Sequence, residues 1–234
     1  MLDEYSTILD RAEAELIEKK SRFIATVCPV KSEDEARAFI AEMKKKYWDA
    51  THNVFAYQIG ERNEIQRSSD DGEPQGTAGK PVLDVLAGGD IKNTAVVVTR
   101  YFGGTLLGTG GLVRAYGRCA KLGIEEAGIA KVRHYKECSV VTDYNTSGKI
   151  QYEITKGEYI LKETLYTDKV EFIVLLDKDN ENSFTQMVNE ATMGRSEVNV
   201  LREIYGAWVK EKLVEIIWEL CSGLYGMLRR WYFQ

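Results

Sequence analysis

The stretch from Thr94 to Arg118 constrains the fold more than any other part of the chain. It begins with the apolar run TAVVVT and continues as RYFGGTLLGTGGLVRAYGR, which places six glycines and three arginines in nineteen residues. Thr94–Phe102 predicts a buried strand, and the residues from Gly111 to Gly128 predict a helix that ends at its last glycine. A strand, a glycine-rich loop and a helix in direct succession indicate an α+β fold.

The residues before this stretch predict further regular elements separated by turn residues. Apolar positions at helical spacing follow a serine and glutamate in the pattern of a capping box. A polar segment with three glycines and one proline predicts a long loop. The predicted elements are a strand at Ser21–Val30, a helix that follows Ser32, a strand at His52–Gly60, a loop at 61–80 and a short helix at Pro81–Gly88.

The second half of the chain has a different succession of elements. Two apolar strands at 158–167 and 169–178 are separated only by a short polar turn, and a strand and a helix stand on each side of them. The first of these helices is predicted to be capped by Asn145. The order βαββαβ is that of the ferredoxin-like split unit. The predicted domains are therefore 1–133 and 137–205, with a boundary near Arg133–Lys136.

The last residues, 206–234, form a third predicted segment. Apolar residues recur every three or four positions, which predicts one amphipathic helix of about seven turns. Such a helix packs on another domain or on a second copy of the chain, so self-association is a possible consequence. The residues of this apolar face are Val209, Leu213, Ile216, Leu220, Leu224, Leu228 and Trp231.

Composition excludes several classes of protein. The net charge of −5 is unlike that of proteins that coat nucleic acid non-specifically, so any contact with nucleic acid depends on a local patch. The four cysteines contain no C-x-x-C pair and there are only two histidines, which makes a zinc site unlikely and fits a reducing cytoplasm. No signal peptide and no membrane-spanning segment are predicted.

The glycine-rich stretch matches neither standard nucleotide motif. A Rossmann fingerprint needs a third glycine where Val113 stands. In GTAGKP, Pro81 stands where a P-loop has its hydroxyl residue, and Pro74 stands where it has its first glycine. A nucleotide site of either kind is therefore excluded.

An anion site at the start of the predicted helix remains possible. Backbone N–H groups at a helix N-terminus favour an anion, and Arg100, Arg114 and Arg118 add full positive charges. The last two are four residues apart and share one helix face. The alternative is that the glycines only permit tight turns and close packing. Those glycines are Gly103, Gly104, Gly108, Gly110 and Gly111.

A second polar segment, SSDDGEPQGTAGKP, contains three closely spaced carboxylates. Asp70, Asp71 and Glu73 are residue types that bind Mg²⁺ together with substrate phosphates. The alternative is a turn with solvated charges. His52, just before a predicted strand, is expected to be a hydrogen-bonded structural residue.

Four segments together resemble the IMPACT/YigZ family, in its bacterial two-domain form. They are KKSRFIA, DATHNVFAYQIG, DDGEPQGTAGKPVLDVL and VVVTRYFGGTLLGTGGLVRAYG. The resemblance covers residues 17–205, and the two glycine-rich blocks occur in the family's order and separation. Residues 206–234 are additional to the family pattern.

The resemblance implies a fold for each domain and a general kind of function. The first domain would be similar to domain 2 of ribosomal protein S5, and the second to the last domain of elongation factor G. Both likenesses indicate RNA or the translation machinery. Eukaryotic relatives regulate translation through a protein partner and an additional domain, so their role is not expected here intact.

These considerations favour a non-enzymatic RNA- or ribosome-associated protein without a cofactor, linked to the regulation of translation. The two blocks would form one groove in which cations bind phosphates and aromatic rings stack on bases. Two alternatives are a Mg²⁺-dependent phosphate- or nucleotide-processing enzyme that uses the three carboxylates, and a protein-interaction module. The predicted RNA- or anion-binding residues are Lys80, Arg100, Tyr101, Phe102, Gly103, Gly104, Gly108, Gly110, Gly111, Arg114, Tyr116 and Arg118.

Overall fold

The protein consists of two compact units, which we call unit 1 (residues 1–131) and unit 2 (residues 132–234). The predicted boundary at Arg133–Lys136 lies inside strand β7 (Ile129–Thr142). The computed structural model describes residues 4–157, 159–209, 212–217 and 228–232.

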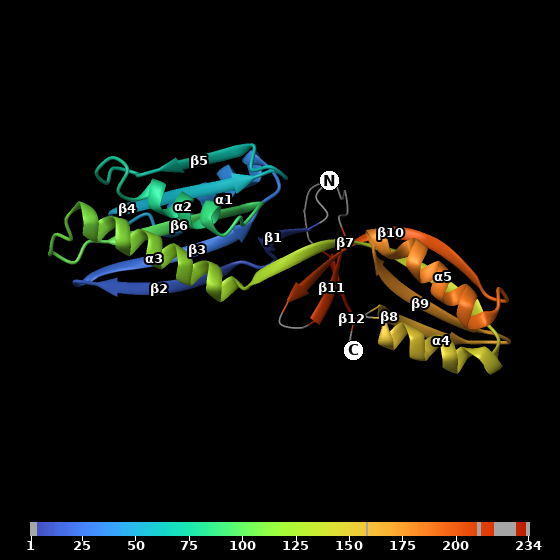
Figure 1. The fold of residues 1–234 in the computed structure, drawn as a ribbon. Helices are drawn as coiled ribbons and strands as arrows, with labels where there is room; N and C mark the ends of the chain where they lie inside the picture. Colours follow the sequence, from blue (N-terminus) through green and yellow to red (C-terminus); the bar gives the residue numbers. More distant parts are fainter. Residues whose placement is uncertain (1–3, 158, 210–211, 218–227, 233–234) are drawn as a thin grey trace. The chain divides into compact units, whose positions relative to one another are not determined.

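Unit 1 contains a five-stranded antiparallel sheet in the order β2-β3-β6-β4-β5 (Figure 1). The central strand β6 pairs with β3 on one side and with β4 on the other. A further short strand, β1 (Glu4–Ile8), precedes the sheet. The five strands are β2 (Ala12–Glu18), β3 (Ser21–Pro29), β4 (His52–Ile59), β5 (Ile65–Ser69) and β6 (Thr94–Tyr101).

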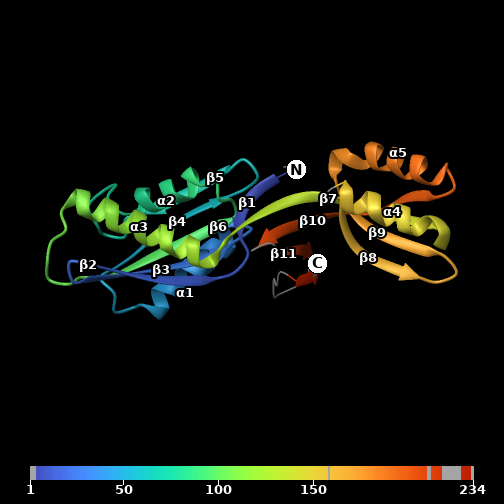
Figure 2. The ribbon, with the colours of Figure 1, turned by 60° about the horizontal axis from the view of Figure 1, so that its bottom comes forward.

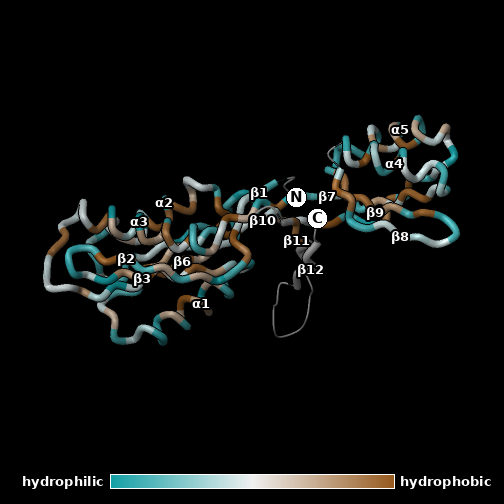
Figure 3. Tube along the Cα trace, turned by 90° about the horizontal axis from the view of Figure 1, so that it is seen from below, coloured by the Kyte–Doolittle hydropathy of each residue, from teal (hydrophilic) through white to brown (hydrophobic). Residues whose placement is uncertain are grey.

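Helices cover both faces of this sheet, as Figure 3 shows. Helix α1 (Glu33–Lys46) lies on one face, and α2 (Gly79–Gly88) and α3 (Thr109–Ala127) lie on the other. In β6, Val96 and Val98 pack toward α2 and α3, whereas the alternate residues pack toward α1. A strand buried on both sides has no polar face, which explains the uninterrupted apolar run TAVVVT.

The predicted start of α1 is confirmed. The side chain of Ser32 accepts a hydrogen bond from the backbone N–H of Glu35 at 3.2 Å, as an N-cap should. The Glu35 carboxylate accepts a hydrogen bond from the backbone N–H of Lys31 at 2.8 Å, one residue before the position expected of a capping box.

The predicted loop at 61–80 is wrong in part. Residues Ile65–Ser69 form strand β5, and α2 begins at Gly79 instead of Pro81. β5 is an edge strand whose middle residues are polar and exposed, so it lacks the alternating apolar pattern by which a half-buried strand is recognised. Strands β1 and β2 were not predicted.

As far as β10, unit 2 has the predicted order of strands and helices. The strands β10, β7, β9 and β8 are neighbours in that order, and α4 and α5 lie on one face of them (Figure 2). Helix α4 begins earlier than predicted because Asp143, rather than Asn145, caps it; the Asp143 carboxylate accepts from the N–H of Thr146 at 2.9 Å. After β7 the elements are α4 (Tyr144–Lys156), β8 (Ile160–Tyr166), β9 (Val170–Asp177), the 3-10 turn η1 (Lys178–Asn180), α5 (Glu181–Thr192) and β10 (Glu197–Val209).

The predicted C-terminal helix is wrong wherever the structure describes this segment. Strand β10 continues to Val209, and β11 (Lys212–Ile217) and β12 (Leu228–Tyr232) extend the sheet beside it. The hairpin register pairs Trp208 with Leu213 and Tyr205 with Ile216, so Leu213 and Ile216, which were placed on one helix face, lie in a strand. Residues 210–211, 218–227 and 233–234 of the predicted helix lie outside the described residues. The described residues of this segment contain no helix through which the chain could self-associate.

Membrane insertion through a helix was not predicted. Within the parts of the chain that the structure describes, none of the helices combines the length and the apolar character of a membrane-spanning segment.

Candidate functional site at the loop end of unit 1

Both glycine-rich blocks lie at one end of unit 1, which we call the loop end. It is formed by the turn at Lys19–Lys20, the turn at 47–51, the loop at 70–78, the loop at 102–108 and the start of α3. The strand registers require this convergence, because β3 and β4 begin where β5 and β6 end (Figure 1). The backbone N–H of Thr51 also donates to the carbonyl of Arg100 at 2.9 Å.

A buried ion pair joins the two blocks. The Glu73 carboxylate accepts hydrogen bonds from the Arg100 guanidinium at 2.6 Å and from the Tyr116 hydroxyl at 2.7 Å. The Glu73 and Arg100 side chains are only 4% and 6% exposed. Burial, together with the hydrogen bond to Glu73, raises the pKa of Tyr116 far above its ordinary value. The two blocks therefore meet, but at this point they are joined by a buried ion pair and leave no open groove between Glu73 and Arg100.

Arg100 is held on several sides. Its guanidinium lies 5.4 Å from the ring centroid of Phe23 and 5.5 Å from that of Phe102, and it donates to the Ser21 hydroxyl at 3.3 Å. Among the described side chains its Nε is the one buried polar atom without a hydrogen-bond partner. Because the charge of Arg100 is already neutralised by Glu73, the structure does not offer it to a phosphate as the sequence predicts.

Asp70 organises the loop between β5 and α2. Its carboxylate accepts hydrogen bonds from the backbone N–H groups of Gly76, Ala78 and Gly79 at 2.8, 3.0 and 2.8 Å. Burial raises the pKa of this carboxyl, but the three N–H donors outweigh that effect and the pKa lies below its ordinary value. The positive end of α2 is thus satisfied from within the protein.

Asp71 and His52 fix the same loop to β4. The Asp71 carboxylate accepts from Lys44 Nζ and from the backbone N–H of Asn53, both at 2.7 Å. His52 Nδ1 lies 2.8 Å from the carbonyl oxygen of Asp71 and must donate to it, because a carbonyl only accepts. His52 Nε2 then faces Glu73 at 3.8 Å. The expectation that His52 is a hydrogen-bonded structural residue agrees with this geometry.

The three predicted magnesium ligands are not arranged as a metal site. Asp70 is bound to backbone amides, Asp71 to Lys44, and Glu73 to Arg100. Among the described residues, no three His, Cys, Asp or Glu side chains gather closely enough to hold an ion. The three carboxylates were predicted to be metal ligands because the sequence does not show which cations and backbone amides bind them in the fold.

The glycines of the second block have distinct structural roles. A Cβ on Gly103 would overlap the backbone of Lys20 and Ser21, so glycine is required there by close approach. Gly104 has φ +80° with open space around it, which glycine adopts without strain. Gly108 precedes α3, and Gly110 and Gly111 lie in the first turn of that helix.

The other predicted binding residues divide into engaged and exposed side chains. Tyr116 is buried, the Tyr101 hydroxyl donates to Asp49 at 2.9 Å, and Lys80 pairs with Asp84 on the surface of α2. Phe102 is 46% exposed, and Arg114 and Arg118 project from α3 into solvent.

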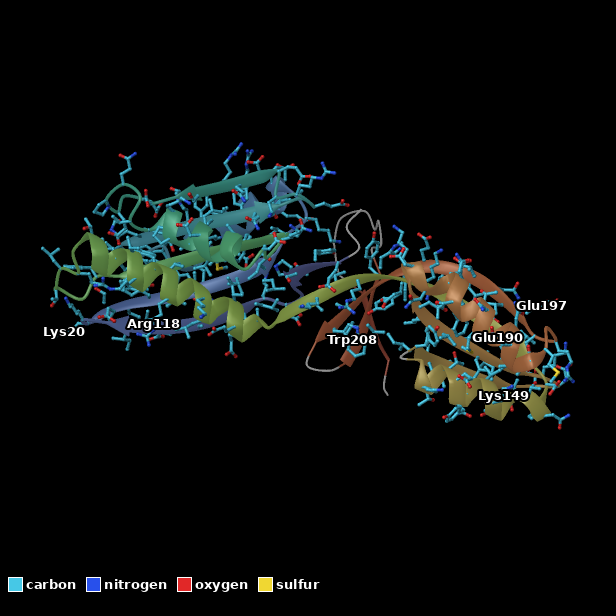
Figure 4. The ribbon with its side chains drawn as sticks, in the orientation of Figure 1. Lys20, Arg118, Lys149, Glu190, Glu197 and Trp208 are labelled. Carbon is cyan, nitrogen blue, oxygen red and sulfur yellow. The ribbon has the colours of Figure 1, made fainter. Side chains whose placement is uncertain are left out.

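Several exposed residues of the loop end were missed by the sequence analysis. Trp48 is 82% exposed and Leu106 is 83% exposed. Lys19 and Lys20 form the turn before β3, where Figure 4 shows Lys20, and Lys45 lies in the last turn of α1. The lysine pair before a predicted strand and the tryptophan in the polar segment KKKYWDATH were the available signals.

The comparisons with known proteins agree on one family. Residues 19–124 match the Impact N-terminal domain, and residues 140–195 match a domain of unknown function (DUF1949). The IMPACT family member YvyE of Bacillus subtilis is 42% identical over 198 residues, which are 85% of this chain and 91% of that protein. An IMPACT family member of Haemophilus influenzae is 33% identical over 189 residues, 78% of this chain and 90% of that protein.

More distant similarities cover different parts of the chain. Protein IMPACT of Rattus norvegicus is 37% identical over 100 residues, which are 41% of this chain and 31% of that protein. A crystal structure described as that of a hypothetical protein aligns with a TM-score of 0.54 and 26% identity, covering 86% of this chain and 99% of that one.

Proposed function

This chain belongs to the IMPACT family, and on that premise we propose that it is a non-enzymatic RNA- or ribosome-associated protein that takes part in the regulation of translation. It binds RNA through the loop end of unit 1. The observation that carries the proposal is a set of exposed cations at the loop end that form no ion pair among the described residues, together with an exposed aromatic ring. The cations are Lys19, Lys20, Lys45 and Arg114, and the ring is that of Phe102.

The charge balance at the loop end supports phosphate binding. The four cations form no ion pair within the described part of the chain. Asp71 and Glu73 are neutralised by Lys44 and Arg100, whereas Asp49 and Asp70 accept hydrogen bonds only from neutral donors, so the four cations face two carboxylates that no described cation neutralises. A positive excess therefore exists locally although the whole protein is acidic, and attraction to phosphates supplies most of the affinity of RNA-binding proteins.

The start of α3 adds backbone donors to this surface. Gly108 precedes the helix without a side chain to cap it, and the first turn contains Gly110 and Gly111. N–H groups at a helix N-terminus favour an anion, and glycine leaves them accessible. Arg114 stands one turn further along, with its guanidinium 3.6 Å from the position of a Cβ on Gly110. Arg118 continues the same helix face.

The fold likenesses belong to the same proposal. We infer a ferredoxin-like fold for unit 2 from the succession β7-α4-β8-β9-α5-β10 and the strand order β10-β7-β9-β8. For unit 1, the family membership supports a likeness to domain 2 of ribosomal protein S5. Both likenesses direct attention to the translation machinery by analogy only. The free thiols of Cys28, Cys119 and Cys138 fit the reducing cytoplasm in which such a role is performed.

Fluorescence anisotropy with labelled RNA at several salt concentrations tests the proposal. The variant Lys20→Glu/Arg114→Glu should lose at least about tenfold in affinity. The slope of log affinity against log salt should fall by about 0.7 for each lost phosphate contact. The matched control is Lys149→Glu/Lys169→Glu in unit 2, which changes the net charge equally at exposed sites; Figure 4 shows Lys149 on α4.

Two results would contradict the proposal. One is the absence of RNA binding by the unaltered protein at low salt. The other is an equal loss of affinity in the control variant, which would show that only the total charge of the protein matters.

A further inference from the structure

We infer that the loop end takes a single strand of RNA rather than a duplex, with its bases stacked on Trp48 and Phe102. Phosphates between those bases meet the lysines beside the rings. This inference rests on the proposed RNA-binding function and specifies the class of RNA. Trp48 and Lys45 thereby become ligand-binding residues on the α1 side of the sheet.

Two aromatic rings are presented to solvent from backbone segments that are bonded to each other. Trp48 is 82% exposed and Phe102 is 46% exposed. The backbone N–H of Phe102 donates to the Thr51 hydroxyl at 3.2 Å, which ties the loop at 102–108 to the turn that contains Trp48. That turn is closed by a hydrogen bond from the N–H of Ala50 to the carbonyl of Tyr47 at 3.1 Å. The backbone segments that carry the two rings are therefore held together before RNA binds.

The Arg100 guanidinium lies against the ring of Phe102. It lies 5.5 Å from the ring centroid and is held below it by Glu73. The exposed part of the ring is thus supported by a rigid, neutralised pair, and it offers a fixed surface on which a base can stack. Neighbouring aromatic rings are engaged otherwise, since Tyr101 is bonded to Asp49 and Tyr116 is buried.

The charges beside the rings identify the ligand. Lys45 stands three residues before Trp48, and Lys20 stands against Gly103 next to Phe102. A cation beside each ring suits a polymer in which flat bases alternate with phosphates. A duplex keeps its bases stacked on one another and would leave both rings uncovered, whereas a single strand offers unstacked bases.

The experiment compares three ligands of equal length with the full chain. They are a single-stranded RNA, the duplex of the same sequence, and an abasic strand that keeps the sugar-phosphate backbone. Trp48→Ala and Phe102→Leu each remove an aromatic face. The second keeps the apolar contact of Phe102, and circular dichroism confirms that the variants are folded. Tyr152→Ala in unit 2, where the ring is 61% exposed, is the matched control.

We expect each loop-end variant to bind the single strand at least about fivefold more weakly, because stacking one base on an aromatic ring contributes about 1 kcal/mol or more. Affinity for the duplex and the abasic strand should change by less than about twofold, since neither depends on stacking. The control variant should bind all three ligands as the unaltered protein does.

The outcomes separate this inference from the proposed function. If the unaltered protein binds RNA but the two variants lose nothing, or lose equally on the abasic strand, the single-strand inference fails and RNA binding stands. If the unaltered protein binds none of the three ligands, the proposed function fails as well. If the unaltered protein binds none of the three ligands but retains a ribosomal protein in a pull-down with purified ribosomal proteins, and Trp48→Ala abolishes that retention, the loop end is a protein-docking surface; the single-strand inference and RNA binding then both fail.

Discussion

Replacing Glu73 by glutamine tests whether the ion pair between Glu73 and Arg100 stabilises the fold of unit 1. Glutamine keeps the volume and one acceptor oxygen but removes the charge opposite Arg100. Two unit charges about 4 Å apart attract each other by about 4 kcal/mol at an effective dielectric constant of 20. Both side chains are at least nine-tenths buried, so solvent screens the pair little. Breaking a buried ion pair on one side costs about 3–5 kcal/mol, which agrees with that figure.

Hydrogen exchange measured by mass spectrometry reports this cost for each unit separately. Amides of the central strand β6 at Val96–Val98 should exchange about a thousandfold faster in Glu73→Gln, because each 1.4 kcal/mol corresponds to a factor of ten. Amides of β9 in unit 2 serve as the internal reference. Asp84→Asn is the control substitution, since it breaks the exposed pair with Lys80 and should cost less than about 1 kcal/mol.

A companion variant decides how the result is interpreted. Glu73→Leu/Arg100→Met removes both charges and should recover most of the lost protection, as replacing a buried pair by apolar residues is often nearly neutral. An acceleration of less than about tenfold in Glu73→Gln would refute the reasoning. It would mean that the Arg100 charge is satisfied by something other than Glu73, and that Arg100 is again a candidate for phosphate binding.

Three further predictions concern the loops and the thiols. Gly103→Ala should cost at least about 2 kcal/mol in thermal unfolding, because its Cβ overlaps neighbouring backbone, and should exceed the cost of Gly104→Ala, whose strain is about 1–2 kcal/mol in open space. Asp70→Asn should cost about 1 kcal/mol at pH 7. The lowered pKa means that this stabilisation is present above the ordinary value of 3.8 and is lost as pH falls through the folded-state pKa, so the difference from the unaltered protein should shrink in acid unfolding. Burial raises the pKa of Cys119 to about 12, so a thiol reagent at pH 8 should modify Cys119 only as fast as the protein unfolds, which mass spectrometry of the labelled peptides measures.

The sequence predicted best where local chemistry and tertiary packing agree. The cap at Ser32, the buried strand at Thr94 and the helix that ends at Gly128 each combine a local signal with an apolar face. Unit 2 was predictable for the same reason, because its strands and helices alternate with clear turn residues between them. Such agreement across levels is what makes an element recognisable from one sequence.

The C-terminal segment shows that the spacing of apolar residues alone does not distinguish a helix from a hairpin. Apolar residues three or four apart fit one helix face, but a tight hairpin brings residues five apart into register, as it does Trp208 and Leu213. The hairpin is held by long-range contacts that no window of sequence contains. Trp208 Nε1 donates to the Tyr135 hydroxyl at 2.8 Å, and Leu213 joins Tyr135, Leu175 and Ile204 in one apolar cluster.

The candidate site shows a different limit, because its residue types were predicted and their partners were not. Arg100 and Arg114 are the same residue in the same block, yet one is neutralised inside the protein and the other extends into solvent. The decisive partner of Arg100 is Glu73, twenty-seven residues earlier in the chain. Distance in sequence hides such a pair unless homologous sequences or a structure reveal it.

The division between paired and unpaired residues also explains how the loop end keeps its shape. Asp70 holds the backbone amides before α2, Glu73 anchors that loop to β6, and the Ser21 hydroxyl accepts from the N–H of Gly103 at 3.2 Å. Motif residues that make these internal bonds cannot also bind a ligand. A ligand would therefore contact the exposed side chains of the motifs, such as Phe102 and Arg114, and the exposed side chains between the motifs. Because the internal bonds order this surface beforehand, less entropy is lost when the ligand binds.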